Sequence, residues 1–319
     1  MKKILLLDPG VSSFNRGDEI ISDGVIKNLN YILEKNFVTS VSTHTPLNLV
    51  YIKHLKDYDM KFVCGSNLLM GRLNGLFRQW DVSFKSAVAV KGCILVGAGW
   101  WKYNTKPNFY TKILYRSILS KDVIHSVRDE YTKNMLESIG IKNVINTGCA
   151  TMWNFTPEFC RKIPTKKSDT VIFTLTDYKR DIRNDKAIVD LLVKNYNKVC
   201  YWVQGEKDYD YLMELGEYKN IEIINGTLKE YDNFLDNNDC DYVGTRLHGG
   251  IRALQKKRRS IIISIDNRAE EKKKDFNIPC VSRTNIDDIE YMIKNDFATE
   301  INIPLENINK WKAQFEHEK

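Results

Sequence analysis

The feature that most constrains the fold is a repeated alternation between short runs of β-branched and aliphatic residues and longer amphipathic stretches. This alternation is typical of βαβ units, in which helices join parallel strands and cover the sheet. We therefore predict an α/β protein with parallel sheets. The runs predict strands at 3–8, 37–43, 61–64, 93–96, 123–127 and 143–146, and then at 171–175, 199–203, 221–224, 242–244 and 260–265.

The length of the chain and a gap in the alternation predict two domains. The chain has 319 residues, more than the ~250–300 at which one hydrophobic core stops growing. Segment 161–169 contains a proline and few apolar residues, which indicates a linker. We predict an N-terminal domain at 1–160, a C-terminal domain at 170–303, and a last helix at 304–319 that packs back on the first domain.

The composition narrows the class of protein and of partner. Hydrophobic residues make up 43% and charged residues 28% of the chain, which excludes disordered and disulfide-scaffold classes. The formal net charge is +7, a mild excess that favours phosphorylated small molecules or an anionic membrane surface. Because the excess is smaller than that of a dedicated nucleic-acid binder, we expect no nucleic-acid partner.

The apolar runs and the cysteines indicate the cellular compartment of the protein. The longest purely apolar runs are far shorter than the ~20 residues that a membrane-spanning helix needs. The seven cysteines form no CxxC pair and mostly lie within apolar runs. We therefore expect a reduced, cytoplasmic protein without a metal site.

Two loops of the first half carry candidate ligand-binding residues, because ligands of open α/β sheets bind at the carboxyl ends of the strands. After the first strand, a polar loop opens a helix with Asp18 and Glu19 in its first turn. Asp18 either only caps that helix or also contacts a substrate. After the fourth strand, two glycines precede Trp100 and Trp101, which either fill the core or stack on a sugar ring.

Two further strand exits carry arginines. Arg128 lies at a helix N-terminus, a poor position for a cation unless an anion is nearby; Asp129 or a ligand would supply it. In the second half, a strand runs into Arg246 and His248, and a helix is predicted at 251–257. Arg246 and His248 would project to the same side if the exit loop is extended. They offer a permanent anion-binding group and one that titrates near neutral pH. Arg268 comes after the next strand.

These residues, in this order, resemble the polysaccharide pyruvyltransferase family over about residues 4 to 280. The Arg-Leu-His element followed by Ala-Leu is the most specific part of the resemblance, and a Gly-Ala-Gly segment and the other motifs are short. The matching segments are 15–19, 97–99, 126–129, 244–248 and 253–254.

The resemblance implies two Rossmann-like, doubly wound parallel-sheet domains facing a cleft, in a GT-B-like arrangement. It implies phosphoenolpyruvate as co-substrate, with no cofactor, and a sugar or lipid-linked oligosaccharide as acceptor, joined as a pyruvyl ketal. It also implies peripheral association with the inner face of the membrane. The implied site residues are His248 and Arg128 as catalytic groups, Arg246, Arg268, Leu247 and Gly249 at the donor, and Asn15, Asp18, Glu19, Trp100 and Trp101 at the acceptor.

Two other functions are compatible with the residues. A GT-B glycosyltransferase that uses a nucleotide-sugar would have the same fold, because fold does not fix function. Three arginines suit a small trianion better than a nucleotide, whose base and ribose need their own pocket. A carbohydrate-binding protein without activity would account for Trp100 and Trp101 but not for His248.

Overall fold

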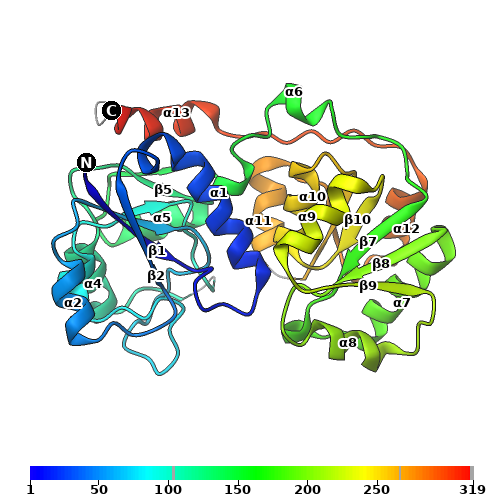
Figure 1. The fold of residues 1–319 in the computed structure, drawn as a ribbon, viewed down its shortest axis with the longest axis horizontal. Helices are drawn as coiled ribbons and strands as arrows, with labels where there is room; N and C mark the ends of the chain where they lie inside the picture. The colour runs from blue at the N-terminus through cyan, green and yellow to red at the C-terminus, as the bar shows by residue number, and fades with distance from the viewer. Residues whose placement is uncertain (103–104, 266, 317–319) are drawn as a thin grey trace. The chain divides into compact units, whose positions relative to one another are not determined.

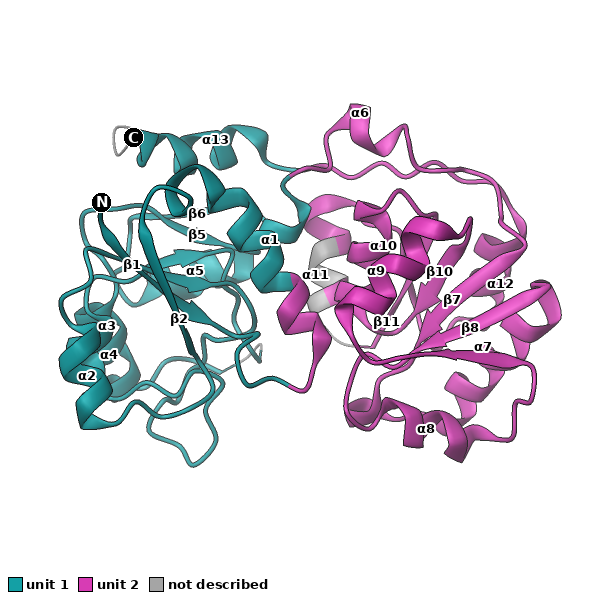
Figure 2. Ribbon diagram, viewed as in Figure 1, with its two compact units in different colours: residues 1–13, 21–153, 303–319 teal, residues 14–20, 154–302 magenta. Residues whose placement is uncertain are grey.

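The computed structural model describes residues 1–102, 105–265 and 267–316, except for the side chains of 267, 268 and 270–272. The chain divides into two compact units (Figures 1 and 2). Unit 1 contains Met1–Ser13, Ile21–Trp153 and Ile303–Lys319. Unit 2 contains Phe14–Ile20 and Asn154–Asn302.

Unit 1 is built on a parallel sheet. The first four strands run in the order β2-β1-β3-β4. The parallel pair β5-β6 continues beside β4, because the Gly97 N–H donates to the Ser126 carbonyl and the Arg128 N–H to the Ala98 carbonyl. The strands are β1 (Lys3–Asp8), β2 (Phe37–Ser42), β3 (Met60–Cys64), β4 (Ile94–Val96), β5 (His125–Val127) and β6 (Val144–Asn146).

The strand β1 shows why this sheet is covered on both faces. Leu5 and Leu7 belong to one hydrophobic cluster, while Ile4 and Leu6 belong to another. Because neighbouring residues of a strand point to opposite faces, a continuous aliphatic run is buried on both sides. The helices of unit 1 are α1 (Arg16–Leu33), which begins in unit 2, α2 (Leu49–Leu55), α3 (Ala87–Val90), α4 (Phe109–Ile118), α5 (Glu130–Ser138) and α13 (Leu305–Ala313).

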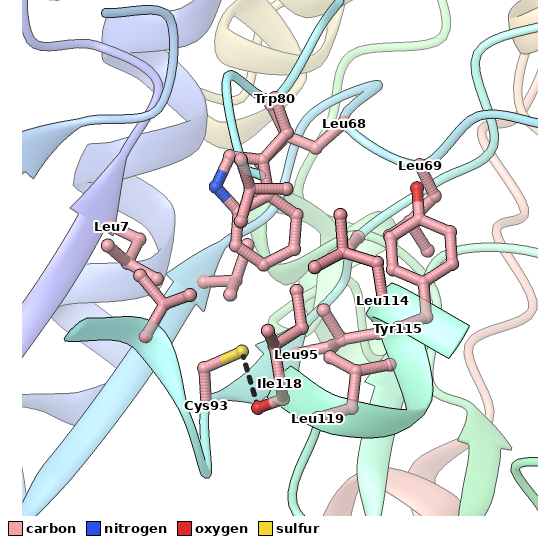
Figure 3. Packing of buried hydrophobic residues seen from close by; sticks show 14 of the residues in the cluster. Leu7, Leu68, Leu69, Trp80, Cys93, Leu95, Leu114, Tyr115, Ile118 and Leu119 are labelled. Carbon is pink, nitrogen blue, oxygen red and sulfur yellow. Dashed lines mark hydrogen bonds between the residues drawn. The ribbon is translucent and has the colours of Figure 1, made fainter. Parts of the chain in front are cut away.

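Figure 3 shows the cluster on one face of this sheet, where Trp80, Leu114 and Tyr115 pack together. The Cys93 thiol belongs to the same cluster and donates to the Ile118 carbonyl at 3.4 Å. On the other face, Trp311 of α13 is completely buried and contacts Trp153 with ring centroids 5.5 Å apart. The C-terminal helix is therefore part of the core of unit 1.

Unit 2 has a six-stranded parallel sheet in the order β12-β11-β10-β7-β8-β9. If β7 is counted as the first strand, this is the strand order of a dinucleotide-binding fold. The strand order reverses direction between β7 and β10. The strands are β7 (Thr170–Thr174), β8 (Lys198–Trp202), β9 (Ile221–Ile224), β10 (Asp241–Gly244), β11 (Ser260–Ser264) and β12 (Cys280–Ser282). The helices are α6 (Pro157–Cys160), α7 (Ile182–Asn195), α8 (Asp208–Leu215), α9 (Leu228–Asn237), α10 (Leu247–Gln255), α11 (Asn267–Phe276) and α12 (Ile286–Lys294).

The prediction of two doubly wound α/β domains is confirmed, and the predicted strands lie within one or two residues of the observed ends. The division falls between Trp153 and Asn154 rather than in 161–169. Trp153 packs against Trp311 in the core of unit 1, whereas Phe155 and Phe159 contact each other within unit 2, with ring centroids 5.6 Å apart. None of the helices in the described part of the chain has both the length and the apolar character of a membrane span.

Candidate functional site

The carboxyl ends of β7 and β10, where the strand order of unit 2 reverses, carry a polar cluster around Arg246, one of the predicted site residues. Crevices at such positions bind ligands in open α/β sheets. The segment after β10 carries Arg246 and His248, and the segment after β7 carries Asp177. The hydroxyls of Thr176 and Thr245 lie 2.9 Å apart and tie the two exits together.

Arg246 is buried, with 4% of its side chain exposed, and its guanidinium is largely engaged. Nε donates to Oδ2 of Asp208 at 3.0 Å and to the Leu175 carbonyl at 3.1 Å. Nη2 donates to Oδ1 of Asp177 at 2.8 Å and to Oδ1 of Asp208. Nη1 has no partner in the part of the chain that the structure describes. Two carboxylates therefore hold this cation in place and leave one nitrogen for a further anion.

The charges of Arg246 and Asp208 affect each other's pKa. Burial lowers the pKa of Arg246, but the charge and hydrogen bond of Asp208, together with Tyr178 and Asp177, outweigh burial, and the pKa lies above its ordinary value. Burial raises the pKa of Asp208, and Arg246 together with the N–H groups of Gly205 and Asp177 opposes that rise. Without the positive charge of Arg246, Asp208 would be a buried and uncompensated carboxylate, so the pair favours the charged guanidinium.

His248 lies in the first turn of α10 and is 9% exposed. The sequence predicted this helix only from 251, with an extended loop before it, but the helix begins at Leu247 and Arg246 is its N-cap. The early start is possible because Gly249 and Gly250 have no side chain. A Cβ on Gly250 would lie 2.6 Å from Cγ1 of Ile262, and one on Gly249 would lie 2.8 Å from Oε1 of Gln204. Arg246 and His248 thus lie at a helix N-terminus and not in an extended loop.

The predicted acceptor loop, residues 15–19, belongs to unit 2 and not to the N-terminal domain that the sequence assigned to it. Asn15 pairs with Gly205 in an isolated β-bridge, and the Arg16 N–H donates to the Gln204 carbonyl at 3.0 Å. Oδ1 of Asn15 accepts from the Gly17 N–H at 3.1 Å, so Asn15 and not Asp18 caps α1. Asp18 lies within the helix.

Gln204 links this loop to the rest of the cluster. Its Nε2 donates to Oδ1 of Asn15 at 3.1 Å, while its Oε1 is buried without a partner among the described residues. Glu19 forms an ion pair with Arg16 at 3.4 Å. An unpaired buried carbonyl oxygen is costly unless a donor such as a hydroxyl reaches it.

In unit 1, Arg128 is buried beside its neighbour Asp129. Nε donates to Oδ2 of Asp129 at 2.9 Å, and Nη2 donates to the Trp100 carbonyl at 3.0 Å. Gly99 permits this packing, because a Cβ there would lie 2.0 Å from Nε of Arg128. Burial raises the pKa of Asp129, but the charge of Arg128 and hydrogen bonds from Thr132 outweigh it and hold the pKa below its ordinary value. Asp129 is thus the anion that the position of Arg128 required, and the catalytic role of Arg128 stays a prediction.

The two tryptophans after β4 differ. Trp100 is completely buried within the core cluster, so the prediction that it stacks on an acceptor sugar is wrong. Its ring packs near Tyr115, with centroids 6.2 Å apart. Trp101 is half-buried, contacts Phe77 with centroids 5.1 Å apart, and lies under Nζ of Lys102 at 4.1 Å. Of the two, Trp101 alone offers an aromatic surface to a ligand.

Several residues of the cluster were not predicted. Asp177 and Asp208 bind Arg246, and the ring centroid of Tyr178 lies 5.0 Å from the guanidinium carbon of Arg246. Arg246 was predicted because it comes directly after a strand, and the same criterion, applied to β7, identifies Asp177. Leu247 and Gly249 are buried in the first turn of α10. The side chain of Arg268 lies outside the described residues.

Comparison with known proteins gives one family. The model of the family described as polysaccharide pyruvyl transferase matches residues 15–267. No curated protein matches the chain.

Solved structures with a similar fold include a UDP complex, a glycosyltransferase and a UDP-GlcNAc 2-epimerase. The S. aureus MnaA–UDP structure is 14% identical with a TM-score of 0.55, and the alignment covers 99% of this chain and 97% of that one. A glycosyltransferase from Rickettsia africae is 15% identical with a TM-score of 0.51 and 99% of each chain covered. The UDP-GlcNAc 2-epimerase from Neisseria meningitidis, bound to UDP-GlcNAc, is 14% identical with a TM-score of 0.50 and all of both chains covered. At these identities the similarity concerns the fold, which is GT-B-like.

Proposed function

The chain belongs to the polysaccharide pyruvyl transferase family, and from this premise we propose that it transfers the pyruvyl group of phosphoenolpyruvate to two hydroxyls of a sugar as a cyclic ketal. The observation that carries the proposal is Nη1 of Arg246, which has no partner among the described residues and lies where the strand order reverses. The first turn of α10 comes directly after it, and the N–H groups at a helix N-terminus attract anions. Phosphoenolpyruvate, with a carboxylate and a phosphate on three carbons, suits such a combination.

The reaction needs a group that gives and takes protons beside the anion site. A proton is added to the methylene carbon of the donor, C2 gains oxocarbenium character, and the first sugar hydroxyl attacks C2. Phosphate leaves, and the second hydroxyl closes the ring at the same carbon. In the overall reaction, one of the two hydroxyl protons ends on the new methyl group and the other on phosphate. His248, two residues after Arg246, is the proposed general acid and base.

We propose that the sugar hydroxyls are held near the loop that carries Asn15, Asp18 and Glu19. The buried Oε1 of Gln204, without a partner among the described residues, lies at this loop and can accept a hydrogen bond from a hydroxyl. Trp101 is the proposed stacking surface for a sugar of the acceptor. A lipid-linked oligosaccharide is the proposed acceptor class.

Ligand-dependent thermal stability tests the donor. Phosphoenolpyruvate at about 100 times its Kd should stabilise the protein by about 2.7 kcal/mol. UDP and inorganic phosphate are the matched comparisons, since UDP would stabilise a nucleotide-sugar glycosyltransferase and phosphate alone would fill only part of the site. Stabilisation by UDP without stabilisation by phosphoenolpyruvate would contradict the proposal. Mass spectrometry of glycosides incubated with enzyme and donor should then detect the pyruvyl ketal.

A further inference from the structure

Residues 47–121 of unit 1 combine a strong positive charge with exposed apolar side chains. This segment contains twelve Lys and Arg but three Asp and Glu, a net charge of +9 against +7 for the whole chain. Large apolar side chains at its loops and helix starts are each exposed by at least 44%, and Leu76 is exposed in full. We call the following residues the apolar edge: Leu49, Val50, Leu76, Phe77, Phe84 and Phe109.

The topology of unit 1 collects these side chains at one edge of its sheet. Each lies between the end of a parallel strand and the first turn of the following helix, and those ends share the carboxyl edge. Asn48 caps α2 just before Leu49 and Val50, and Asn108 caps α4 just before Phe109. The apolar residues therefore occupy loops and helix starts that lie at the same edge.

Contacts between the loops show that the apolar edge is continuous. Nδ2 of Asn108 donates to Oδ1 of Asn74 at 2.7 Å, which ties the loop of Leu76 to the start of α4. Phe84 contacts Tyr110 edge to face, with ring centroids 4.9 Å apart. One cavity of about 740 Å³ brings the start of α2 to the same place, and its lining includes Leu47, Phe84, Lys85 and Tyr110. Figure 2 shows α2, α3 and α4 grouped together.

Basic side chains surround the apolar edge. Arg72, Lys85 and Lys102 are exposed on the same loops, and Lys106 lies just before α4. Lys53 is exposed in the last turn of α2, four residues after Leu49. Apolar side chains that are exposed at a loop tip and flanked by lysines are typical of proteins that lie on a membrane surface. Juxtaposed lysines and arginines attract anionic lipid headgroups.

We propose that the apolar edge docks unit 1 on a bilayer that contains anionic lipids. A second copy of the chain is a poorer occupant, because two such edges would bring like charges together. A nucleic acid would use the lysines but not the exposed leucine and phenylalanine tips. The proposal does not depend on the identity of the donor or of the acceptor.

Sedimentation with vesicles tests the proposal. The full chain should bind vesicles of two parts phosphatidylcholine to one part phosphatidylglycerol. Its binding to vesicles of phosphatidylcholine alone should be about tenfold weaker. Binding should weaken as the salt concentration rises, because headgroup attraction is screened. Absence of binding to the anionic vesicles at low salt would overturn the proposal.

Variants locate the surface. Leu49→Ser with Leu76→Ser should reduce the vesicle partition coefficient about tenfold, and Lys53→Glu with Lys85→Glu at least as much. The matched control is Tyr291→Ser in unit 2, which changes a side chain that is 66% exposed. An equal loss of vesicle binding in the control would overturn the proposal. It would also be overturned if variants of the apolar edge changed the oligomeric state in sedimentation but not the binding to vesicles. Circular dichroism checks that each variant is folded, and binding of phosphoenolpyruvate, measured separately, reports on the donor site.

Discussion

Unit 1 carries 22 Lys and Arg against 13 Asp and Glu, a net charge of +9, whereas unit 2 carries 26 against 28, a net charge of −2. In unit 2, Asp177 and Asp208 neutralise Arg246 within the protein. In unit 1, exposed lysines and apolar side chains crowd the carboxyl edge of the sheet. Two similar α/β folds thus use the same edge in different ways, one for a buried polar cluster and one for an open, basic, apolar surface.

The largest effect is expected where the cluster of unit 2 is broken. Arg246→Ala leaves the buried Asp208 uncompensated, which should cost about 3–5 kcal/mol of unfolding free energy. Differential scanning calorimetry should show an earlier transition, and phosphoenolpyruvate affinity should fall. In Arg246→Lys the charge remains, so stability should recover more than affinity, because lysine lacks the forked donor geometry. Equal donor affinity in a folded Arg246→Lys variant and the parent would show that the arginine binds no donor.

The second test concerns chemistry in the same cluster. His248→Gln keeps size and hydrogen bonding but removes the titrating proton, so kcat should fall ~10²- to 10⁴-fold. Thermal-shift titration should give nearly the parent affinity for phosphoenolpyruvate. If the variant turns over like the parent, another residue carries the proton transfer, and Asp18 and Glu19 are the next candidates.

The third test concerns pH and unit 1. His125 is completely buried; its Nδ1 accepts from the Leu95 N–H at 3.2 Å and its Nε2 bonds to the Ser120 carbonyl at 2.9 Å. Burial lowers its pKa from 6.5 to about 4. Between these values the unfolded chain binds a proton that the folded chain does not, so stability is lost as pH falls from 6.5 toward 4, by about 3 kcal/mol.

Chemical denaturation at several pH values measures this loss. His125→Gln should remove most of the pH dependence in that range, whatever its effect on stability at neutral pH. His54→Gln, which changes an exposed histidine, is the matched control and should keep the parent slope. An unchanged slope in His125→Gln would mean that other groups account for acid sensitivity.

The smallest effect is expected at the open edge of unit 1. Trp101→Ala should raise the KM for the acceptor about tenfold, as expected for one lost stacking contact, with little change in stability because the ring is half-buried. Trp100→Ala is the comparison: removing a fully buried ring should cost about 3–5 kcal/mol. If Trp101→Ala leaves the acceptor KM unchanged, Trp101 is not part of the acceptor site.

The sequence predicted most strands of both sheets but not β12. This strand has three residues, Cys280–Ser282, too few for alternation to stand out, and it is held by pairing with β11. The start of α10 was also missed. Two successive glycines predict a loop, yet here they lie inside a helix because Tyr242 and Ile262 leave no room for side chains.

The sequence by itself determined the α/β class, the two sheets and the position of Arg246 and His248 after a strand, because these depend on local periodicity and on the order of residues along the chain. Only the tertiary structure decided that Asp177 and Asp208 hold Arg246, that residues 15–19 join unit 2, and that Trp100 is core while Trp101 is accessible. The physical reason is that β7 and β10 are adjacent in the sheet, although 66 residues of chain lie between the end of β7 and the start of β10. Which side chains meet at such an edge depends on how the strands pair and pack, and this is a property of the folded sheet.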